Sequence, residues 1–217
     1  DASSWRFTGH LANMPLFYEG RDDGWKEAPA TIKGKYLDNF KKIWDLYINN
    51  SKYDKNTLAT GGYDAEAEFK NGEAVFFQNG TWEYDALKKS ISDDDMQMIP
   101  IYCGVDGEEK AGLCSGTENC CSAITFVPSS EVMAEQFGAI PYKKAADSGN
   151  VFLKNANDLF DAGNYNVDWA FNYTPNVDEW RASLVAAMNK YDAGGSWDDV
   201  KTAFVQGWAT QYKAANK

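Results

Sequence analysis

Two glycine turns enclose an apolar run in the segment FKNGEAVFFQNGTWE (residues 69–83), and this segment decides the predicted fold. Asp64 lies just upstream and can cap a short helix. Asn71 followed by Gly72 is typical of the end of such a helix, where one residue takes the left-handed conformation. Residues 73–78, with an apolar run at 74–77, then predict a buried β-strand, because the run is short and is bounded by turn residues.

A second helix and two further strands are predicted after this segment. The chain turns at 79–80, and Thr81 can cap a helix that runs to about Ser90. Short apolar runs at 96–101 and 120–127 predict two more strands. Because helices alternate with short apolar strands, the sequence predicts an α/β fold with a short central sheet flanked by helices.

Three longer helices are predicted from apolar side chains that recur every three or four residues. The first covers 34–50. The second begins at a cap formed by Asp178 and runs to Tyr191, and the third follows the Ser196 cap to residue 213. Three tryptophans lie on these apolar stripes and are expected in the core: Trp44, Trp197 and Trp208.

The composition excludes several classes of protein. The chain has 217 residues, of which 21 are Lys or Arg and 32 are Asp or Glu, so its net charge is −11. With 44% hydrophobic residues it can bury a core, and its length predicts one domain. The negative charge repels a phosphate backbone, so no nucleic acid is expected as a partner. No run of 18 apolar residues and no export-signal pattern occurs, so no direct membrane span is expected.

Histidine and cysteine chemistry is restricted in this chain. His10 is the single histidine, so a multi-histidine metal site and most nucleophile–histidine pairs cannot form. Four cysteines lie close together without Cys-x-x-Cys spacing, and small buried or incidentally paired residues are expected. If they oxidise, a bridge between Cys103 and Cys114 is preferred over one between the adjacent Cys120 and Cys121. We therefore expect no metal and no cofactor.

The segment 69–83 resembles a recurrent segment of the extracellular solute-binding proteins of bacterial sugar ABC importers, the maltose-binding-protein group. In that group a helix ends in Phe-x-x-Gly, a strand of small residues follows, and x-Asn-Gly-x-Trp opens a helix at the ligand cleft. Further segments resemble the group in the same order along nearly the whole chain: 9–16, 98–100, 137–141 and 175–181.

The resemblance implies a single lobe of a two-lobe periplasmic-binding-protein-like fold. The whole chain, 1–217, would form this C-terminal-lobe domain, and strands within 95–131 would cross toward the missing N-terminal lobe. The strand before 131 runs almost directly into 137–141, where the family normally carries a helix of the other lobe. The resemblance also implies an extracellular or periplasmic location, a lipid anchor in the full-length protein, and an ABC transporter permease as partner.

The resemblance further implies ligand-binding residues at two helix starts. Trp82 follows a strand-to-helix turn, where its indole can stack on a sugar face, and its alternative is packing under a neighbouring helix. Trp180 and Arg181 resemble a second aromatic site at the same cleft. Trp180 also lies on an apolar stripe, so core packing competes with ligand binding. Arg181 can donate to sugar hydroxyls or a uronate, or pair with Asp178 or Glu179.

A second group of ligand candidates lies in the N-terminal segment and in loops. His10 and Asn13 occupy a segment that lines the cleft near the hinge in the group, although a hydrogen-bonded structural role is the default for a lone histidine. Glu118 and Asn119 resemble the glycine-rich cleft loop, where paired acceptors suit vicinal hydroxyls, and a plain turn is the alternative. Trp169 is a further exposed-aromatic candidate.

The function implied is non-catalytic binding of a sugar or oligosaccharide for an ABC transporter. Closing of two lobes around the sugar would be the mechanism in the intact protein. Two alternatives stay open. One is a glycoside hydrolase fragment, since two suitably spaced carboxylates suffice for that chemistry. The other is an engineered scaffold without a ligand. The sequence favours a binding protein over an enzyme.

Overall fold

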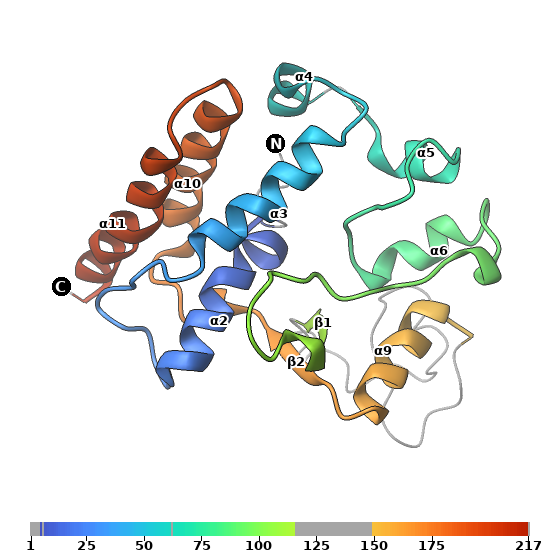
Figure 1. Cartoon of the computed structure of the whole chain (residues 1–217), viewed down its shortest axis with the longest axis horizontal. Helices are drawn as coiled ribbons and strands as arrows, with labels where there is room; N and C mark the ends of the chain where they lie inside the picture. The colour runs from blue at the N-terminus through green and yellow to red at the C-terminus, as the bar shows by residue number, and fades with distance from the viewer. Residues whose placement is uncertain (1–4, 6, 62, 116–148, 217) are drawn as a thin grey trace. The chain divides into compact units, whose positions relative to one another are not determined.

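The computed structural model describes residues 5, 7–61, 63–115 and 149–216 (Figure 1). These residues divide into two compact units. Unit 1 comprises Asp1–Tyr63, Tyr102–Glu108 and Asp168–Lys217, and unit 2 comprises Asp64–Ile101 and Glu109–Val167. The sequence predicts one domain over 1–217, whereas the chain passes between two units more than once.

Unit 1 is helical in its described part. In chain order its elements are the π-helix η1 (Phe7–Leu11), α2 (Asn13–Asp23), α3 (Leu37–Asn49), α4 (Lys55–Thr60), the 3-10 turn η5 (Ala170–Asn172), α10 (Val177–Asp192) and α11 (Trp197–Ala215). Helices α10 and α11 follow each other in the chain and pack side by side (Figure 1). They form the most extensive helix contact among the described elements.

Large aromatic side chains build the core between α10 and α11. Trp180 of α10 meets Phe204 and Trp208 of α11, with ring centroids 5.0 and 6.1 Å apart and near-perpendicular ring planes. The indole nitrogen of Trp208 donates to the Pro29 carbonyl at 2.8 Å. Such edge-to-face pairs stabilise a core beyond the burial of their area, and the hydrogen bond satisfies the one polar atom of the ring.

The predicted helix over 34–50 is confirmed as α3, which begins at Leu37. Its apolar stripe buries Leu37, Phe40 and Ile43. Phe40 contacts Trp197 of α11, with ring centroids 5.8 Å apart. The predicted core tryptophan at 197 is therefore confirmed, as is the one at 208, since both are buried.

A polar network ties α3 to α10. Trp44 donates from its indole nitrogen to Asp192 Oδ1 at 2.8 Å, and Tyr191 donates its hydroxyl to Asp45 Oδ1 at 2.8 Å. Lys41 pairs with the other oxygen of Asp45 at 2.5 Å. Burial raises the pKa of Asp192, because desolvation disfavours its charged form. Trp44, expected in the core, is thus half-buried and bonded to a carboxylate.

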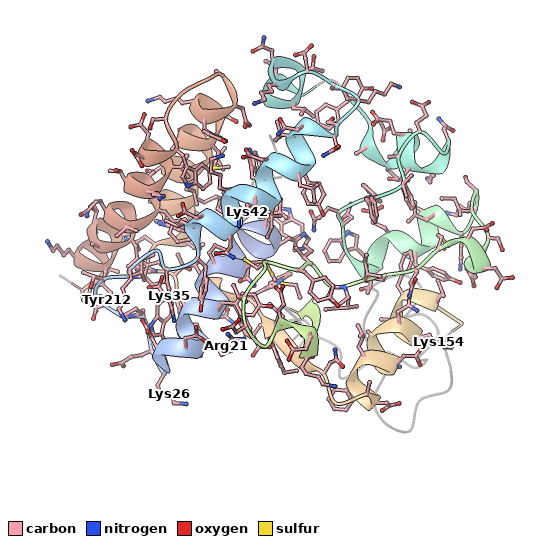
Figure 2. All side chains as sticks on the ribbon, in the orientation of Figure 1. Arg21, Lys26, Lys35, Lys42, Lys154 and Tyr212 are labelled. Carbon is pink, nitrogen blue, oxygen red and sulfur yellow. The ribbon has the colours of Figure 1, made fainter. Side chains whose placement is uncertain are left out.

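Unit 2 combines short helices with a small sheet. Its elements are α5 (Ala65–Lys70), the 3-10 turn η2 (Thr81–Glu83), α6 (Tyr84–Leu87), the 3-10 turn η3 (Asp93–Asp95), β1 (Ala111–Ser115), α9 (Val151–Asp161) and β2 (Tyr165–Asp168), with the 3-10 turn η4 (Glu108–Lys110) at its boundary. Strands β1 and β2 pair in a two-stranded parallel sheet. Lys154, labelled on α9 in Figure 2, pairs with Asp158 one turn later at 2.8 Å.

Residues 73–78 do not form the predicted buried strand. The segment is irregular, and its Val75 and Phe76 are 83% and 74% exposed. Residues 96–101 are not assigned to a strand either, and the predicted strand at 120–127 lies outside the described residues. A strand needs backbone partners from elsewhere in the chain, and a short apolar run does not reveal them. The result is a helix-rich chain with a small sheet, compatible with the predicted α/β class.

Three predicted helix ends are confirmed. The Asp64 carboxylate accepts the Ala67 N–H at 3.0 Å at the start of α5, and Gly72 after its end has a φ of +70°. The Ser196 hydroxyl accepts the Asp198 N–H at 3.1 Å at the start of α11. Local side-chain chemistry therefore fixes these boundaries.

Two other predicted caps are wrong by one or two residues. The helical turn begins at Thr81 itself, and Gly80 occupies the capping position. Helix α10 begins at Val177, so Asp178 lies in its first turn, and Asn176 is the capping residue with a φ of +41°. Asparagine tolerates this left-handed conformation, which lets the chain enter α10 through a tight turn.

Candidate functional site

An aromatic cluster in unit 1, formed by Trp5, His10 and Trp169, is the candidate ligand site. Ring centroids lie 5.8 Å apart for Trp5 and His10, 6.1 Å for His10 and Trp169, and 6.3 Å for the two tryptophans. His10 is buried, Trp169 is half-buried, and Trp5 is 37% exposed. The cluster therefore presents part of its aromatic surface outside the core.

The π-helical turn η1 builds this cluster. Its backbone makes a bond from the Ala12 N–H to the Phe7 carbonyl at 2.8 Å, a spacing of five residues. The same spacing separates Trp5 from His10. π-Helical turns are rare in proteins as a whole, and a large share of those that occur lie at functional sites. Trp5 was not predicted as a ligand candidate, and its five-residue distance from the lone histidine is the signal that could have found it.

Asn13 holds Trp169 in place. Its amide nitrogen donates to the Asp168 carbonyl at 3.1 Å, and its oxygen accepts the Ala170 N–H at 2.6 Å. These bonds clamp the backbone on both sides of Trp169. Asn13 is completely buried, and this burial favours a positioning role over the expected ligand contact.

Arg181 joins α10 to the cluster. Its Nε donates to the Thr8 hydroxyl at 2.8 Å, and its Nη1 pairs with Asp178 at 2.8 Å. Thr8 in turn donates to the Trp5 carbonyl at 3.1 Å. The expected alternative of a pair with Asp178 is therefore present, and Thr8 is a second site residue that was not predicted.

Trp180 does not belong to the site. Its side chain is 1% exposed, and its indole nitrogen donates to the Phe204 carbonyl at 3.0 Å. Burial of this ring against Phe204 and Trp208 argues against the expected role of Trp180 in ligand stacking. The competing core assignment from its apolar stripe is the one observed.

Trp82 lies in unit 2, in the 3-10 turn η2. Its indole is partly exposed and lies against the backbone of Gly80. Asn79 donates from its amide to Glu83 at 2.8 Å across the same turn. Trp82 is thus placed in a hydrogen-bonded local turn.

A groove of about 520 Å³ lies at the other end of the same motif in unit 2. Phe69 at the end of α5, the exposed Val75 and Ile91 contribute apolar walls, and Lys70 and Asp95 contribute charges. Trp82 is not among its lining residues. The groove and the indole are therefore separate features of unit 2.

The remaining candidates fall outside the site or outside the described residues. Glu118 and Asn119, like Cys120 and Cys121, lie in the part of the chain that the structure does not describe. The Cys103 thiol is buried and free, so the preferred bridge to Cys114 is not observed. Burial, followed by the charge of Glu108, raises the pKa of Cys103 to about 12. A thiol that stays protonated is a poor nucleophile.

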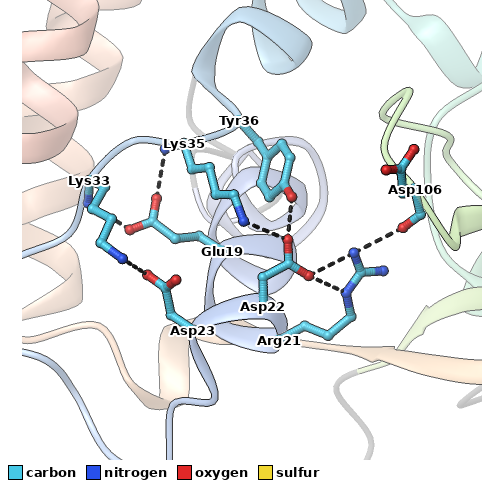
Figure 3. Close-up of polar contacts among 8 residues, drawn as sticks. All are labelled: Glu19, Arg21, Asp22, Asp23, Lys33, Lys35, Tyr36 and Asp106. Atoms are coloured by element: carbon cyan, nitrogen blue, oxygen red, sulfur yellow. Dashed lines mark hydrogen bonds and ion pairs between the residues drawn. The ribbon is translucent and has the colours of Figure 1, made fainter.

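A charged cluster at the end of α2 braces the next loop (Figure 3). Glu19 is 1% exposed, and its two oxygens accept the N–H groups of Lys33 and Lys35 at 2.6 and 2.8 Å. Lys33 also pairs with Asp23 at 2.6 Å. The buried carboxylate is satisfied by backbone donors, as burial of a charge requires.

Asp22 collects the other contacts of this cluster (Figure 3). One oxygen accepts from Lys35 at 2.8 Å and from the Tyr36 hydroxyl, and the other accepts from Arg21 at 2.9 Å. Arg21 also donates to the Asp106 carbonyl at 2.9 Å. Donation from Lys35 and then Tyr36 lowers the pKa of Asp22 to about 2. These mutual pairs make the cluster a structural brace.

Among residues 5, 7–61, 63–115 and 149–216, no three histidine, cysteine or acidic side chains gather in a way that could hold a metal ion. No helix in these ranges is long and apolar enough to cross a membrane. The aromatic cluster and Arg181 offer aromatic stacking beside a hydrogen-bond donor.

Comparison with known proteins gives one match. A family model described as bacterial extracellular solute-binding protein matches residues 1–140. No curated protein and no solved structure matches the chain. The matched residues include η1 with Trp5 and His10, the motif at 69–83, and the turn that carries Trp82.

Proposed function

The chain belongs to the bacterial extracellular solute-binding proteins, and we propose that the solute it binds is a carbohydrate. It therefore binds a solute for transport, outside the cytoplasm. In this proposal the protein binds a sugar or oligosaccharide, delivers it to an ABC transporter permease, and does not catalyse a reaction. The C-terminal-lobe assignment, lobe closure around the sugar and a lipid anchor are parts of the same proposal, and they rest on the order of motifs in the sequence.

The aromatic cluster around η1 is the observation that carries this proposal. A pyranose has apolar C–H faces and a rim of hydroxyls, so its receptor needs flat rings beside fixed hydrogen-bonding groups. Trp5 supplies a partly exposed ring, and Trp169 is held next to it by Asn13. Arg181 and Thr8 supply polar groups beside this cluster, and the hydrogen bond between them fixes their orientation.

Trp82 is proposed as a second stacking residue. Its partial exposure and its place in the 69–83 motif support this role. Glu118 and Asn119 stay in the proposal as acceptors for vicinal hydroxyls. His10 is proposed to support the Trp5 ring by packing against it from the protein interior, since its own side chain is buried.

Titration of the chain with maltotriose and a panel of other oligosaccharides, followed by NMR, tests the proposal. We expect binding no tighter than millimolar, near −4 kcal/mol, because flat aromatic contacts with few hydrogen bonds are weak. Trp5→Ala and Trp82→Ala should each weaken it by about 2 kcal/mol, the usual effect of truncating an anchor ring. Tyr173→Ala is the matched control, because Tyr173 is 38% exposed, like Trp5, in the same unit.

The outcomes separate the remaining possibilities. Saturable binding that depends on Trp5 or Trp82, but not on Tyr173, supports carbohydrate binding. Equal responses of all three variants would refute the assigned site. Sustained release of reducing sugar from the same oligosaccharides would replace binding by hydrolysis, and no response to any sugar would favour a different solute or a scaffold without a ligand.

A further inference from the structure

The indole of Trp82 occupies the place where a side chain of residue 80 would stand. A Cβ placed on Gly80 would lie 2.5 Å from Cε3 of Trp82 and closer still to its Cζ3 and Cη2. All three atoms belong to the six-membered ring of the indole. Any residue other than glycine at position 80 must therefore displace the ring, because no real Cβ contact is that short.

The backbone of Gly80 does not itself need glycine. Its φ of −114° and ψ of 173° are in the extended region that every residue type adopts. Gly72, in the same motif, is the opposite case, because its φ is +70° and an added Cβ would meet nothing within 4 Å. The two glycines of the motif thus serve different ends: Gly72 allows a backbone turn, and Gly80 makes room for an indole.

Hydrogen bonds fix the backbone on both sides of Trp82. Asn79 donates from Nδ2 to Oε1 of Glu83 at 2.8 Å, and its Oδ1 accepts the Gly80 N–H at 3.0 Å. The Glu83 N–H donates to the Gly80 carbonyl at 3.1 Å. Two of these bonds join residues 79 and 80 to residue 83, and the third joins Gly80 to Asn79. Together the three bonds close the turn.

We propose that Gly80 and the Asn79–Glu83 pair are positioning residues that hold the Trp82 indole in one orientation before a ligand arrives. This inference rests on the proposed role of Trp82 in solute binding. A ring that is already ordered loses less side-chain freedom on binding, so a preorganised anchor binds more tightly than a mobile one. Release of the indole is expected to weaken sugar binding by about tenfold.

Fluorine NMR of the fluorotryptophan-labelled chain tests the positioning directly, without a ligand. The chain contains eight tryptophans, and Trp82→Phe identifies the signal of Trp82 by its loss. Gly80→Ala should shift or broaden that signal and leave the other signals in place. Glu83→Ala should broaden it as well, and Glu83→Gln, which keeps an acceptor for Asn79, should not. An unmoved Trp82 signal in Gly80→Ala would overturn the proposal.

A double-mutant cycle supplies the second readout. Gly80→Ala should lower the urea midpoint in the wild-type chain and leave it unchanged in the Trp82→Ala background, where the clash is absent. Equal effects in both backgrounds would overturn the proposal. If Gly80→Ala does not fold alone, recovery of folding in the double variant is itself the expected result.

Maltotriose titration then distinguishes this inference from the proposed function. A wild-type chain that binds no sugar overturns the carbohydrate proposal, while the fluorine signal still decides whether Gly80 holds the indole. A wild-type chain that binds, together with a Gly80→Ala chain that binds equally well despite a moved Trp82 signal, overturns the link between positioning and affinity.

Discussion

Unit 1 and unit 2 build buried apolar clusters of different size. In unit 1, Trp180, Trp208, Phe40 and Phe204 are each no more than 1% exposed. The buried cluster described in unit 2 is small and consists of Tyr84, Leu87, Met96 and Phe152. Unit 2 also carries Phe76 at its surface.

Helix length explains this difference. Helices α10 and α11 have 16 and 19 residues, so each presents four or more turns of one apolar stripe to its partner. In unit 2, helix α5 has six residues and buries none of them, and helix α6 has four residues and buries Tyr84 and Leu87. Long apolar stripes build a core of many large rings, and short helices build a smaller one.

The largest expected effect is the loss of an aromatic ring from the core of unit 1. Trp180→Ala removes the contacts to Phe204 and Trp208 and the indole hydrogen bond to the Phe204 carbonyl. We expect a loss of about 3 to 5 kcal/mol of unfolding free energy, measured by urea titration. Trp82→Ala is the control, with a loss below about 1 kcal/mol, because its ring is not in a core. Equal losses would break the comparison.

The same deletion in both units sharpens the comparison. Leu184 of α10 is 0% exposed and Leu87 of α6 is 2% exposed, so burial alone would predict equal costs for truncation to alanine. We expect about 4 kcal/mol for Leu184→Ala and about 2 kcal/mol for Leu87→Ala, since a small cluster collapses more readily around a cavity. Urea midpoints at fixed slope give both values. The reverse order would show that unit 2 has the more rigid core.

Acid should weaken unit 1 through Asp22. Its pKa is lowered from 3.8 to about 2 by Lys35 first and Tyr36 next, so the folded state favours the charged form. The stabilisation is therefore complete above about pH 4 and is lost as the pH falls toward 2. Solvent screens this partly exposed pair, and about 1 kcal/mol is expected.

Stability measured against pH checks this sign. The difference between the wild-type chain and Asp22→Asn should be about 1 kcal/mol near pH 5 and should vanish near pH 2. Lys33→Gln, which loses an exposed pair on the same loop, is the control and should show no such change over this range. A difference that grew on acidification would refute the assignment.

The smallest effect is expected at the exposed apolar residues of unit 2. Val75→Ser and Phe76→Ser should change the unfolding free energy by less than about 0.5 kcal/mol, because neither side chain is buried. They should also reduce self-association in sedimentation experiments, since an exposed apolar patch promotes contact between copies. Phe152→Ser, at a buried position of the same unit, is the destabilising control. A large loss at Phe76 would place it in a core.

The parts of the fold that depend on local chemistry were predictable. The apolar stripe of α3 and the caps at Asp64 and Ser196 are set by residues a few positions apart, and the structure confirms them. Helix α2 was missed because Pro15 and Gly20 lie inside it, and both are typical of helix ends or turns. In the structure Gly20 lets the ring of Trp25 pack against α2, where a Cβ would lie 2.9 Å from Cε3.

The candidate site was predictable in its residue types and not in its assembly. His10, Asn13, Trp169 and Arg181 were all expected near a ligand, and the structure brings them around η1. The bond between Arg181 and Thr8 joins residues 173 positions apart, and no local pattern encodes such a contact. The burial of Asn13 and Trp180 depends on the same long-range packing, and it favours a supporting role for both over direct ligand contact.

The discontinuity of unit 1 has a consequence during synthesis on the ribosome. The rings at 25 and 40 are covered by the tryptophans at 208 and 197, which belong to the segment Asp168–Lys217. At ordinary elongation rates, that segment begins to emerge about 5 to 20 s after Tyr63. Until that segment emerges, the apolar faces of the nascent helices α2 and α3 lack these covering rings. A chaperone that binds exposed apolar residues would therefore find its substrate in the first third of the chain.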